Sequence, residues 1–71
     1  MSQWPSTRAS KVLAAPLRIG WSVKRQGGGS HRTLGRSDWS DYVWAFHDGV
    51  EIGLVMLSRI ARQTGLSPRD L

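Results

Sequence analysis

The chain has 71 residues and no cysteine, so we expect one small domain without disulfides, thiolate metal ligands or a cysteine nucleophile. Ten Lys and Arg against five Asp and Glu give a net charge of +5, and the apolar runs are too short to cross a membrane. Residues 1–37 carry seven basic side chains and no acid, whereas residues 38–71 carry three basic and five acidic ones. This division favours a polyanion-binding surface over a basic face that only keeps the protein soluble. The first residues lack the apolar stretch of a secretory signal, so we expect a cytoplasmic protein.

The first predicted element is an amphipathic helix that follows a frayed segment, residues 1–5. Ser6 is the expected N-cap, and Gly20 is expected to end the segment. Pro16 removes a backbone donor, so the helix either kinks there or ends near Ala14. The apolar face follows helical spacing, at Ala9, Val12, Leu13, Pro16 and Leu17. The basic residues of the opposite side are Arg8, Lys11 and Arg18.

Three strands are predicted next. Residues 21–26 alternate like a half-buried strand, and residues 27–29 are glycines that suit a hairpin. The second strand runs from Ser30 to Leu34 or Arg36. The third, residues 42–47, is β-branched and aromatic, and a turn at Asp48 and Gly49 follows it. Period-2 alternation places Tyr42, Trp44 and Phe46 on one face of the third strand, and Val43, Ala45 and His47 on the other.

A second helix is predicted over residues 53–64, with Val55 left exposed on its polar side. Its apolar face is formed by Leu57, Ile60, Ala61 and Thr64. Gly65 suits the C-terminal end, and Ser67 begins a short capped turn. The order helix, three strands, helix predicts a two-layer α+β domain over residues 1–71. Its three-stranded antiparallel sheet is expected to carry both helices on one face.

His31 is the residue best suited to proton transfer, because an imidazole titrates near neutral pH. It follows Gly29 and Ser30, where backbone can approach a phosphate closely, and basic residues surround it. RNA carries its own nucleophile, the 2′-hydroxyl, so a positioned base and arginines on the phosphate suffice for cleavage. The pattern therefore allows a ribonuclease site. A strand-end histidine that only hydrogen-bonds its hairpin is the equal alternative.

The other candidate residues are more simply structural. His47 is expected to be held by the turn at Asp48, although a second acid–base role is the alternative. Trp21 and either Trp44 or Phe46 are expected in the core. Trp39, in the loop after Arg36, is the better candidate for an exposed contact. No histidines and acids have the spacing of metal ligands, so we expect no metal and no cofactor.

Several segments in order resemble the HicA family of toxins from type II toxin–antitoxin systems. They are residues 19–21, 24–26 and 29–31, the aromatic strand ending in His47, residues 57–61 of the second helix, and residues 65–66, where that helix ends. The resemblance covers about residues 6–71. It implies a double-stranded-RNA-binding-domain-like fold and a toxin that blocks translation by cleaving messenger RNA. The family's essential histidine falls on His31. The implied partner is a HicB-type antitoxin, which covers the site and represses the operon with the toxin bound.

Together these observations predict a metal-independent endoribonuclease toxin that acts on mRNA, with His31 as the catalytic acid–base residue. The expected RNA- and phosphate-binding residues are Lys24, Arg25, Gly29, Ser30, Arg32 and Arg36. Two other functions stay open. One is an RNA-binding module without catalysis, and the other is an interaction domain for an acidic partner protein.

Overall fold

A computed structural model describes residues 4–71 and shows two helices and five short strands. In chain order they are β1 (Thr7–Arg8), α1 (Ala9–Arg18), β2 (Ser22–Gln26), β3 (Arg32–Gly35), β4 (Tyr42–Trp44), β5 (Glu51–Ile52), α2 (Leu54–Thr64) and a 3₁₀ turn, η1 (Pro68–Asp70). The expected order of helix, three strands and helix is confirmed, and β1 and β5 are additions. None of the helices within residues 4–71 is long and apolar enough to cross a membrane.

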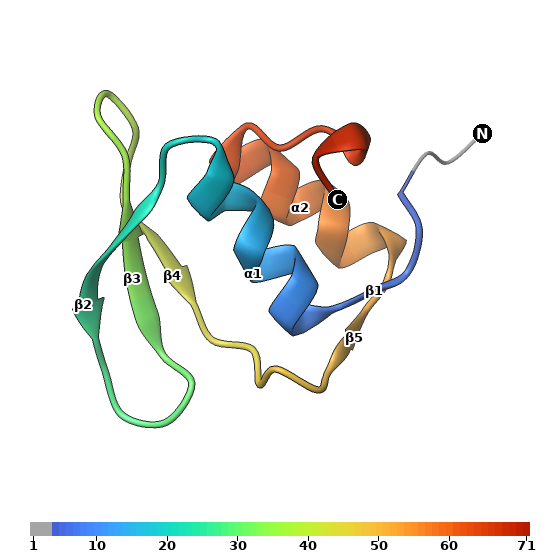
Figure 1. Cartoon of the computed structure of the whole chain (residues 1–71), viewed down its shortest axis with the longest axis horizontal. Coiled ribbons are helices and arrows are strands. Elements are labelled where there is room, and N and C mark those ends of the chain that lie inside the picture. The colour runs from blue at the N-terminus through green and yellow to red at the C-terminus, as the bar shows by residue number, and fades with distance from the viewer. Residues whose placement is uncertain (1–3) are drawn as a thin grey trace.

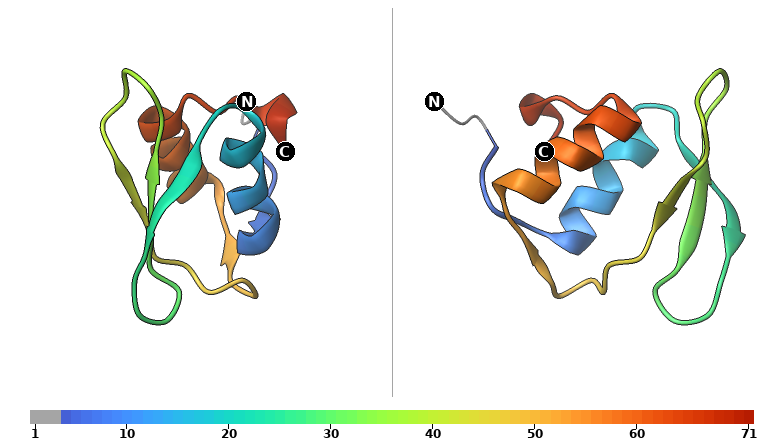
Figure 2. Two further views of the ribbon diagram at one scale, coloured as in Figure 1. Left: turned by 60° about the vertical axis from the view of Figure 1, so that its left-hand side comes forward. Right: turned by 180° about the vertical axis from the view of Figure 1, so that it is seen from behind.

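The main sheet is antiparallel, in the order β2-β3-β4, and both helices lie on one side of it (Figures 1 and 2). Its register places Leu34 opposite Val23 on β2 and opposite Tyr42 on β4. The second sheet joins β1 to β5, so the segments before α1 and before α2 are tied together. The predicted two-layer α+β architecture is therefore confirmed.

The core lies between the main sheet and the two helices. Leu34 and Trp44, from neighbouring strands, are fully buried and point toward the helices. The other buried apolar residues are Ala9, Val12, Ala15, Trp21, Ile52, Leu57, Ile60 and Leu66. Trp4 is half-buried and packs against this cluster, whereas residues 1–3 of the segment expected to fray lie outside the described residues. Among residues 4–71 no helix or strand covers the sheet face away from the helices, which is open to solvent (Figure 2).

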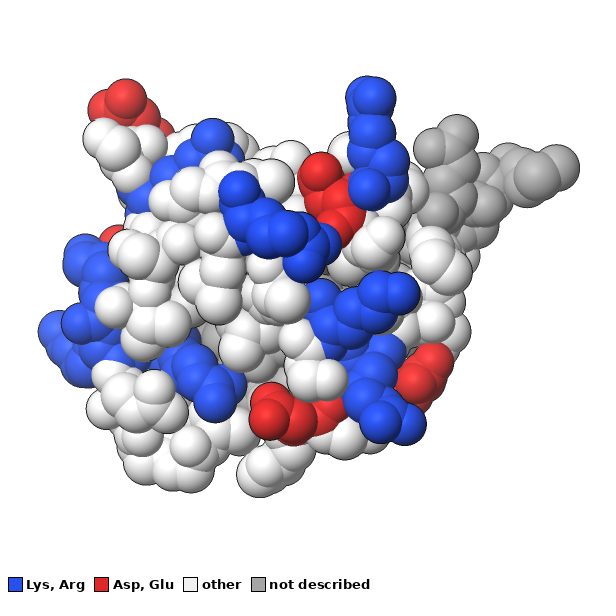
Figure 3. Space-filling view, viewed as in Figure 1, with Lys and Arg blue, Asp and Glu red and all other residues white. Residues whose placement is uncertain are grey.

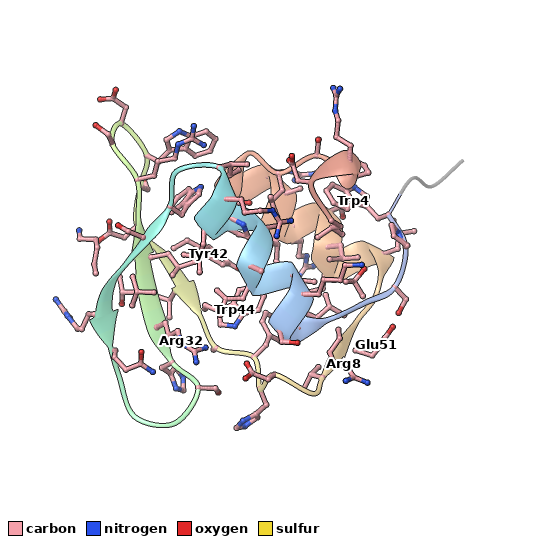
Figure 4. All side chains as sticks on the ribbon, viewed as in Figure 1. Trp4, Arg8, Arg32, Tyr42, Trp44 and Glu51 are labelled. Atoms are coloured by element: carbon pink, nitrogen blue, oxygen red, sulfur yellow. The ribbon has the colours of Figure 1, made fainter. Side chains whose placement is uncertain are left out.

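The N-terminal end of α1 differs from the prediction. Ser6 does not cap the helix, because residues 7–8 form β1 and the helix begins at Ala9. The first N–H groups of the helix have no partner within it. Those of Ala9 and Ser10 donate to the carbonyls of Val50 and Asp48, at 2.7 and 3.1 Å. Backbone acceptors from the loop between β4 and β5 thus replace a side-chain cap. The Ser6 hydroxyl donates to Glu51 Oε2 at 2.6 Å, and Figure 4 shows Arg8 beside Glu51 across the β1–β5 pair.

Pro16 does not end α1, which runs on to Arg18, so of the two alternatives the end near Ala14 is wrong. The Pro16 ring is fully buried, and this packing offsets the lost backbone hydrogen bond. Its carbonyl accepts the N–H groups of Ile19 and Trp21, each at 3.0 Å, which closes the helix before Gly20. Leu17, expected on the apolar face, is 41% exposed, and Ala15 is buried in its place.

Two strands differ from their expected form. All five residues of β2 are exposed, because β2 is the edge of the main sheet and extends past the helices, so the half-buried prediction is wrong. The third strand ends at Trp44 and not at His47. The reason is that Trp44 pairs with Arg32, the first residue of β3, so the residues beyond it have no strand to pair with. The predicted alternation nevertheless persists, since Phe46 is half-buried while Ala45 and His47 are exposed.

The C-terminal elements agree with the prediction. Gly65 ends α2 in the left-handed conformation, with φ of 78°, and its N–H donates to the Ala61 carbonyl at 2.7 Å. Val55 is 67% exposed, as expected. Ser67 and Asp70 form the reciprocal pair of hydrogen bonds of a capping box around η1.

Replacing Gly65 by alanine should lower the free energy of unfolding by about 2 kcal/mol, because an L-residue is strained at this φ. A Cβ would also lie 2.8 Å from Trp39 Cη2. In a domain of this size the melting temperature should fall by roughly 8–16 °C. The matched control is Gly49→Ala, which adds a Cβ in open space and should change the melting temperature little. Equal effects of the two substitutions would contradict the argument.

Candidate nucleic-acid interface

The hairpin loop between β2 and β3 holds His31 in a defined position. The Gly27 N–H donates to the His31 carbonyl at 2.9 Å, and the His31 N–H donates to the Gly28 carbonyl at 3.3 Å. Gly29, with φ of 64°, makes the reversal between them. The His31 ring also lies on this loop, with Nδ1 3.2 Å from the Gly28 carbonyl oxygen. A carbonyl can only accept, so Nδ1 carries the proton and Nε2 of the neutral ring has a free lone pair.

His31 lies on the open face of the main sheet. Side chains alternate between the two faces of a strand, and Leu34 of β3 points into the core. Thr33 and Gly35 therefore belong to the opposite, open face, and His31, two residues before Thr33, continues the same row. The position of Gly27 across the hairpin agrees with this placement of His31. A Cβ added to Gly27 would lie 3.2 Å from the His31 Cβ. The imidazole is exposed.

A β-bulge brings Lys24 and Arg25 to the same face as His31. Val23 pairs with Leu34, but Arg25 pairs with Thr33, so the register shifts by one residue between them. Arg25 thus shares the open face with Thr33. The Lys24 side chain lies over Gly35, where a Cβ would collide with its Cγ and Cδ. Without the bulge, strict alternation would place these two neighbouring cations on opposite faces.

Lys24 is engaged with Asp41, which the sequence analysis did not include in the site. Its Nζ lies 3.0 Å from Oδ1 and 2.9 Å from Oδ2 of Asp41, so part of its charge is compensated. Both side chains are about half exposed, and a pair of this kind contributes little to stability. Arg25 is exposed and has no ion-pair partner within residues 4–71. Within these residues the charge of Arg25 is therefore not compensated by an acidic side chain, whereas that of Lys24 is in part.

A cavity of about 390 Å³ lies at the far end of the same face, between the start of β2 and the loop from β3 to β4. The Arg36 guanidinium carbon lies 5.5 Å above the centre of the Trp39 ring, a cation–π contact. Trp39 in turn meets the buried Trp21 edge to face, with ring centres 5.7 Å apart. Trp39 is 40% exposed, as expected for the tryptophan of this loop. The residues that line the cavity include Ser22, Lys24, Arg36, Trp39 and Asp41.

Arg32 lies on the other face of the sheet, beside Trp44, as Figure 4 shows. It lines a second cavity, of about 240 Å³, with Gly29, Ser30, His47 and Asp48. Arg32 Nη1 and Trp44 Nε1 are buried, and neither has a hydrogen-bond partner among residues 4–71. Such unpaired donors suit an anionic acceptor, whereas the acidic residue Asp48 in the lining opposes one.

The expected binding residues thus fall in three places. Lys24 and Arg25 share the open face with His31. Gly29, Ser30 and Arg32 line the second cavity behind the hairpin, and Arg36 lines the first cavity at the opposite end of the sheet. Asp41 is the residue that sequence reasoning missed, because only the tertiary structure brings it to Lys24. The turn at His47 is made by the backbone, with the Val50 N–H donating to the His47 carbonyl at 3.1 Å.

The basic side chains do not form one continuous patch. Figure 3 shows Lys and Arg at the edge of the sheet over β2 and, separately, across the helices, with mostly uncharged surface between them. Arg8, Lys11 and Arg18 belong to the helix side and are distant in the fold from the hairpin, so the charge of the first half of the chain is divided. Burial raises the pKa of the Tyr42 hydroxyl above its usual value.

Fold and site define a small basic α+β domain that presents one oriented histidine among cations on an open sheet face. The family model described as HicA toxin of bacterial toxin-antitoxin matches residues 9–66 of this chain. The chain therefore belongs to the HicA toxin family, and it is a toxin component of a toxin–antitoxin system. Among curated proteins no match to the chain was found.

Proposed function

We propose that this toxin is an endoribonuclease that cleaves mRNA with His31 as its catalytic residue. The observation that carries the proposal is the arrangement of the His31 ring, which is exposed, held at Nδ1 by the Gly28 carbonyl and without a hydrogen-bond partner at Nε2 among residues 4–71. A lone pair at a fixed position is what a general base requires. Membership of a toxin family supports a destructive activity in preference to RNA binding alone.

The reaction follows from the groups on the open face. Nε2 of His31 takes the proton of an RNA 2′-hydroxyl, and the oxygen attacks the adjacent phosphorus. The bond from phosphorus to the 5′ oxygen breaks, and that oxygen takes up a proton from water. The products are a 2′,3′-cyclic phosphate and a 5′-hydroxyl end. Arg25, on the same face, is placed to stabilise the negative charge that develops on the phosphate oxygens.

The same exposed face supports a proposal for the partner that membership of a toxin–antitoxin family implies. His31 and Arg25 are exposed, so a HicB-type antitoxin with acidic side chains over them would fit this face and block access of RNA to the histidine. Both the toxin and its mRNA substrate would then meet in the cytoplasm. No metal has a role in the proposed steps, because the nucleophile belongs to the RNA and the base is an imidazole.

Purified wild-type protein should cleave single-stranded RNA in the presence of excess EDTA, and the new 5′ ends should be hydroxyls. The same sequence made with 2′-O-methyl groups should remain intact, because it has no nucleophile. Gel analysis and end-labelling by polynucleotide kinase without prior phosphatase measure both results. Bound but intact RNA after long incubation would instead identify a binding module without catalysis.

A further inference from the structure

The cavity at the far end of the open face is not used by the proposed chemistry. It lies beside Gly35, four residues from His31 along β3, which corresponds to about 13 Å at the rise of a strand. It shares the face that carries His31, Arg25 and Lys24. RNA whose backbone lies along this face would bring a neighbouring nucleotide, distinct from the one that is cleaved, to the cavity.

One wall of the cavity is suited to a flat ring. Trp39 is 40% exposed, and its indole is held in place by the edge-to-face contact with Trp21. The Arg36 guanidinium over the Trp39 ring adds a second planar, cationic surface. Unpaired RNA bases stack on such aromatic and guanidinium planes. A positively charged rim with a stacking wall thus favours a nucleobase as the occupant.

Two other lining residues of the cavity, Lys24 and Asp41, present hydrogen-bonding groups of both kinds. The two carboxylate oxygens of Asp41 accept, and Lys24 Nζ donates, with only 2.9 to 3.0 Å between them. A carboxylate has about four lone-pair sites and an ammonium has three donors, so both keep capacity while paired with each other. Guanine has two adjacent donors, N1–H and the N2 amino group, beside an acceptor, O6. These three groups form the Watson–Crick edge of guanine. The Watson–Crick edges of adenine, cytosine and uracil lack two adjacent donors.

We propose that this cavity is a subsite for an unpaired guanine, and that it sets a sequence preference. Asp41 accepts from N1–H and the N2 amino group, Lys24 donates to O6, and the base stacks on Trp39 and Arg36. The inference rests on the proposed function in that the bound RNA is the substrate of His31. Its test, however, measures binding without cleavage.

The probes are 2′-O-methyl heptauridylates, each with one guanine, inosine or adenine at a defined position, titrated against the wild-type chain by fluorescence anisotropy. At the preferred position guanine should bind about tenfold more tightly than adenine. Inosine, which lacks the N2 amino group, should lie between them. Equal binding of guanine and adenine at every position would overturn the proposal.

Two variants and one control assign the effect to the cavity. Asp41→Asn should remove the advantage of guanine over adenine, because an amide offers one acceptor in place of two. Trp39→Ala should weaken binding of all three bases by roughly tenfold. Asp38→Asn is the control: it makes the same chemical change in the same loop, at a residue that does not line the cavity and has a φ of 69° that asparagine tolerates.

The outcomes separate the two proposals. A guanine preference that Asp41→Asn removes and Asp38→Asn keeps supports the subsite, whether or not ordinary RNA is cleaved. If the two asparagine variants behave alike, the subsite is wrong, even though cleavage by His31 can stand. If the guanine preference is found but wild-type protein leaves ordinary RNA intact, the proposed nuclease function is wrong and the base-binding site remains.

Discussion

Replacing His31 by alanine should lower the rate of RNA cleavage by about 10²–10⁴-fold, the usual contribution of a positioned general base. The His31 ring is exposed and makes one hydrogen bond, to the Gly28 carbonyl, so the fold should tolerate the loss of the ring. Induced expression of the wild-type chain should arrest bacterial growth, whereas the variant should not. Rates from single-turnover assays and circular dichroism spectra of both proteins check the two parts of this expectation.

His47→Ala is the matched control for that experiment. His47 is also an exposed histidine near the hairpin, but its cavity lies on the face of Arg32, away from the His31 ring. The variant should cleave RNA at nearly the wild-type rate. A His31→Ala protein that cleaves as fast as wild type would exclude His31 as the base. An equal loss in both variants would show that two histidines share the proton transfers.

Replacing Trp44 by alanine should lower the free energy of unfolding by about 3–5 kcal/mol, the range found for large aromatic residues in cores. Trp44 is fully buried between the sheet and the helices, and it meets Phe46 edge to face with ring centres 5.1 Å apart. Domains are stable by roughly 0.05–0.15 kcal/mol per residue, or about 4–11 kcal/mol for a chain of this length, so this loss is a large part of the total stability. Urea titration should show a protein that is mostly unfolded or close to it.

Trp44→Phe should cost clearly less than Trp44→Ala, for a reason specific to this site. The indole Nε1 is buried, and it has no hydrogen-bond partner among residues 4–71, so phenylalanine removes an unpaired donor and keeps most of the ring. Val43→Ala, at the adjacent residue that is 57% exposed, should change stability by less than about 0.5 kcal/mol. A phenylalanine variant as unstable as the alanine variant would show that Nε1 is satisfied in solution.

Local patterns in the chain were enough for much of the fold. The helical spacing in residues 54–64, the stop at Gly65 and the alternation around Trp44 each depend on near neighbours, and each prediction is confirmed. Several of the expectations that are wrong concern the ends of helices and strands. Ser6 is not a cap, because strand β5, 45 residues later, pairs with the segment that follows it. Likewise the strand after Trp44 stops because its partner β3 stops.

For the candidate site, too, one part could be predicted from the sequence and another part required the tertiary structure. Sequence alone determined that a histidine lies in a glycine-rich hairpin among cations, since these residues adjoin along the chain. Only the tertiary structure decided that Lys24 and Arg25 both share its face. A one-residue bulge places Lys24 and Arg25 with His31, while strand alternation sends Arg32 to the other side. The pairing of Lys24 with Asp41 depends on β3 lying between β2 and the loop that carries Asp41, a long-range arrangement that no local pattern encodes.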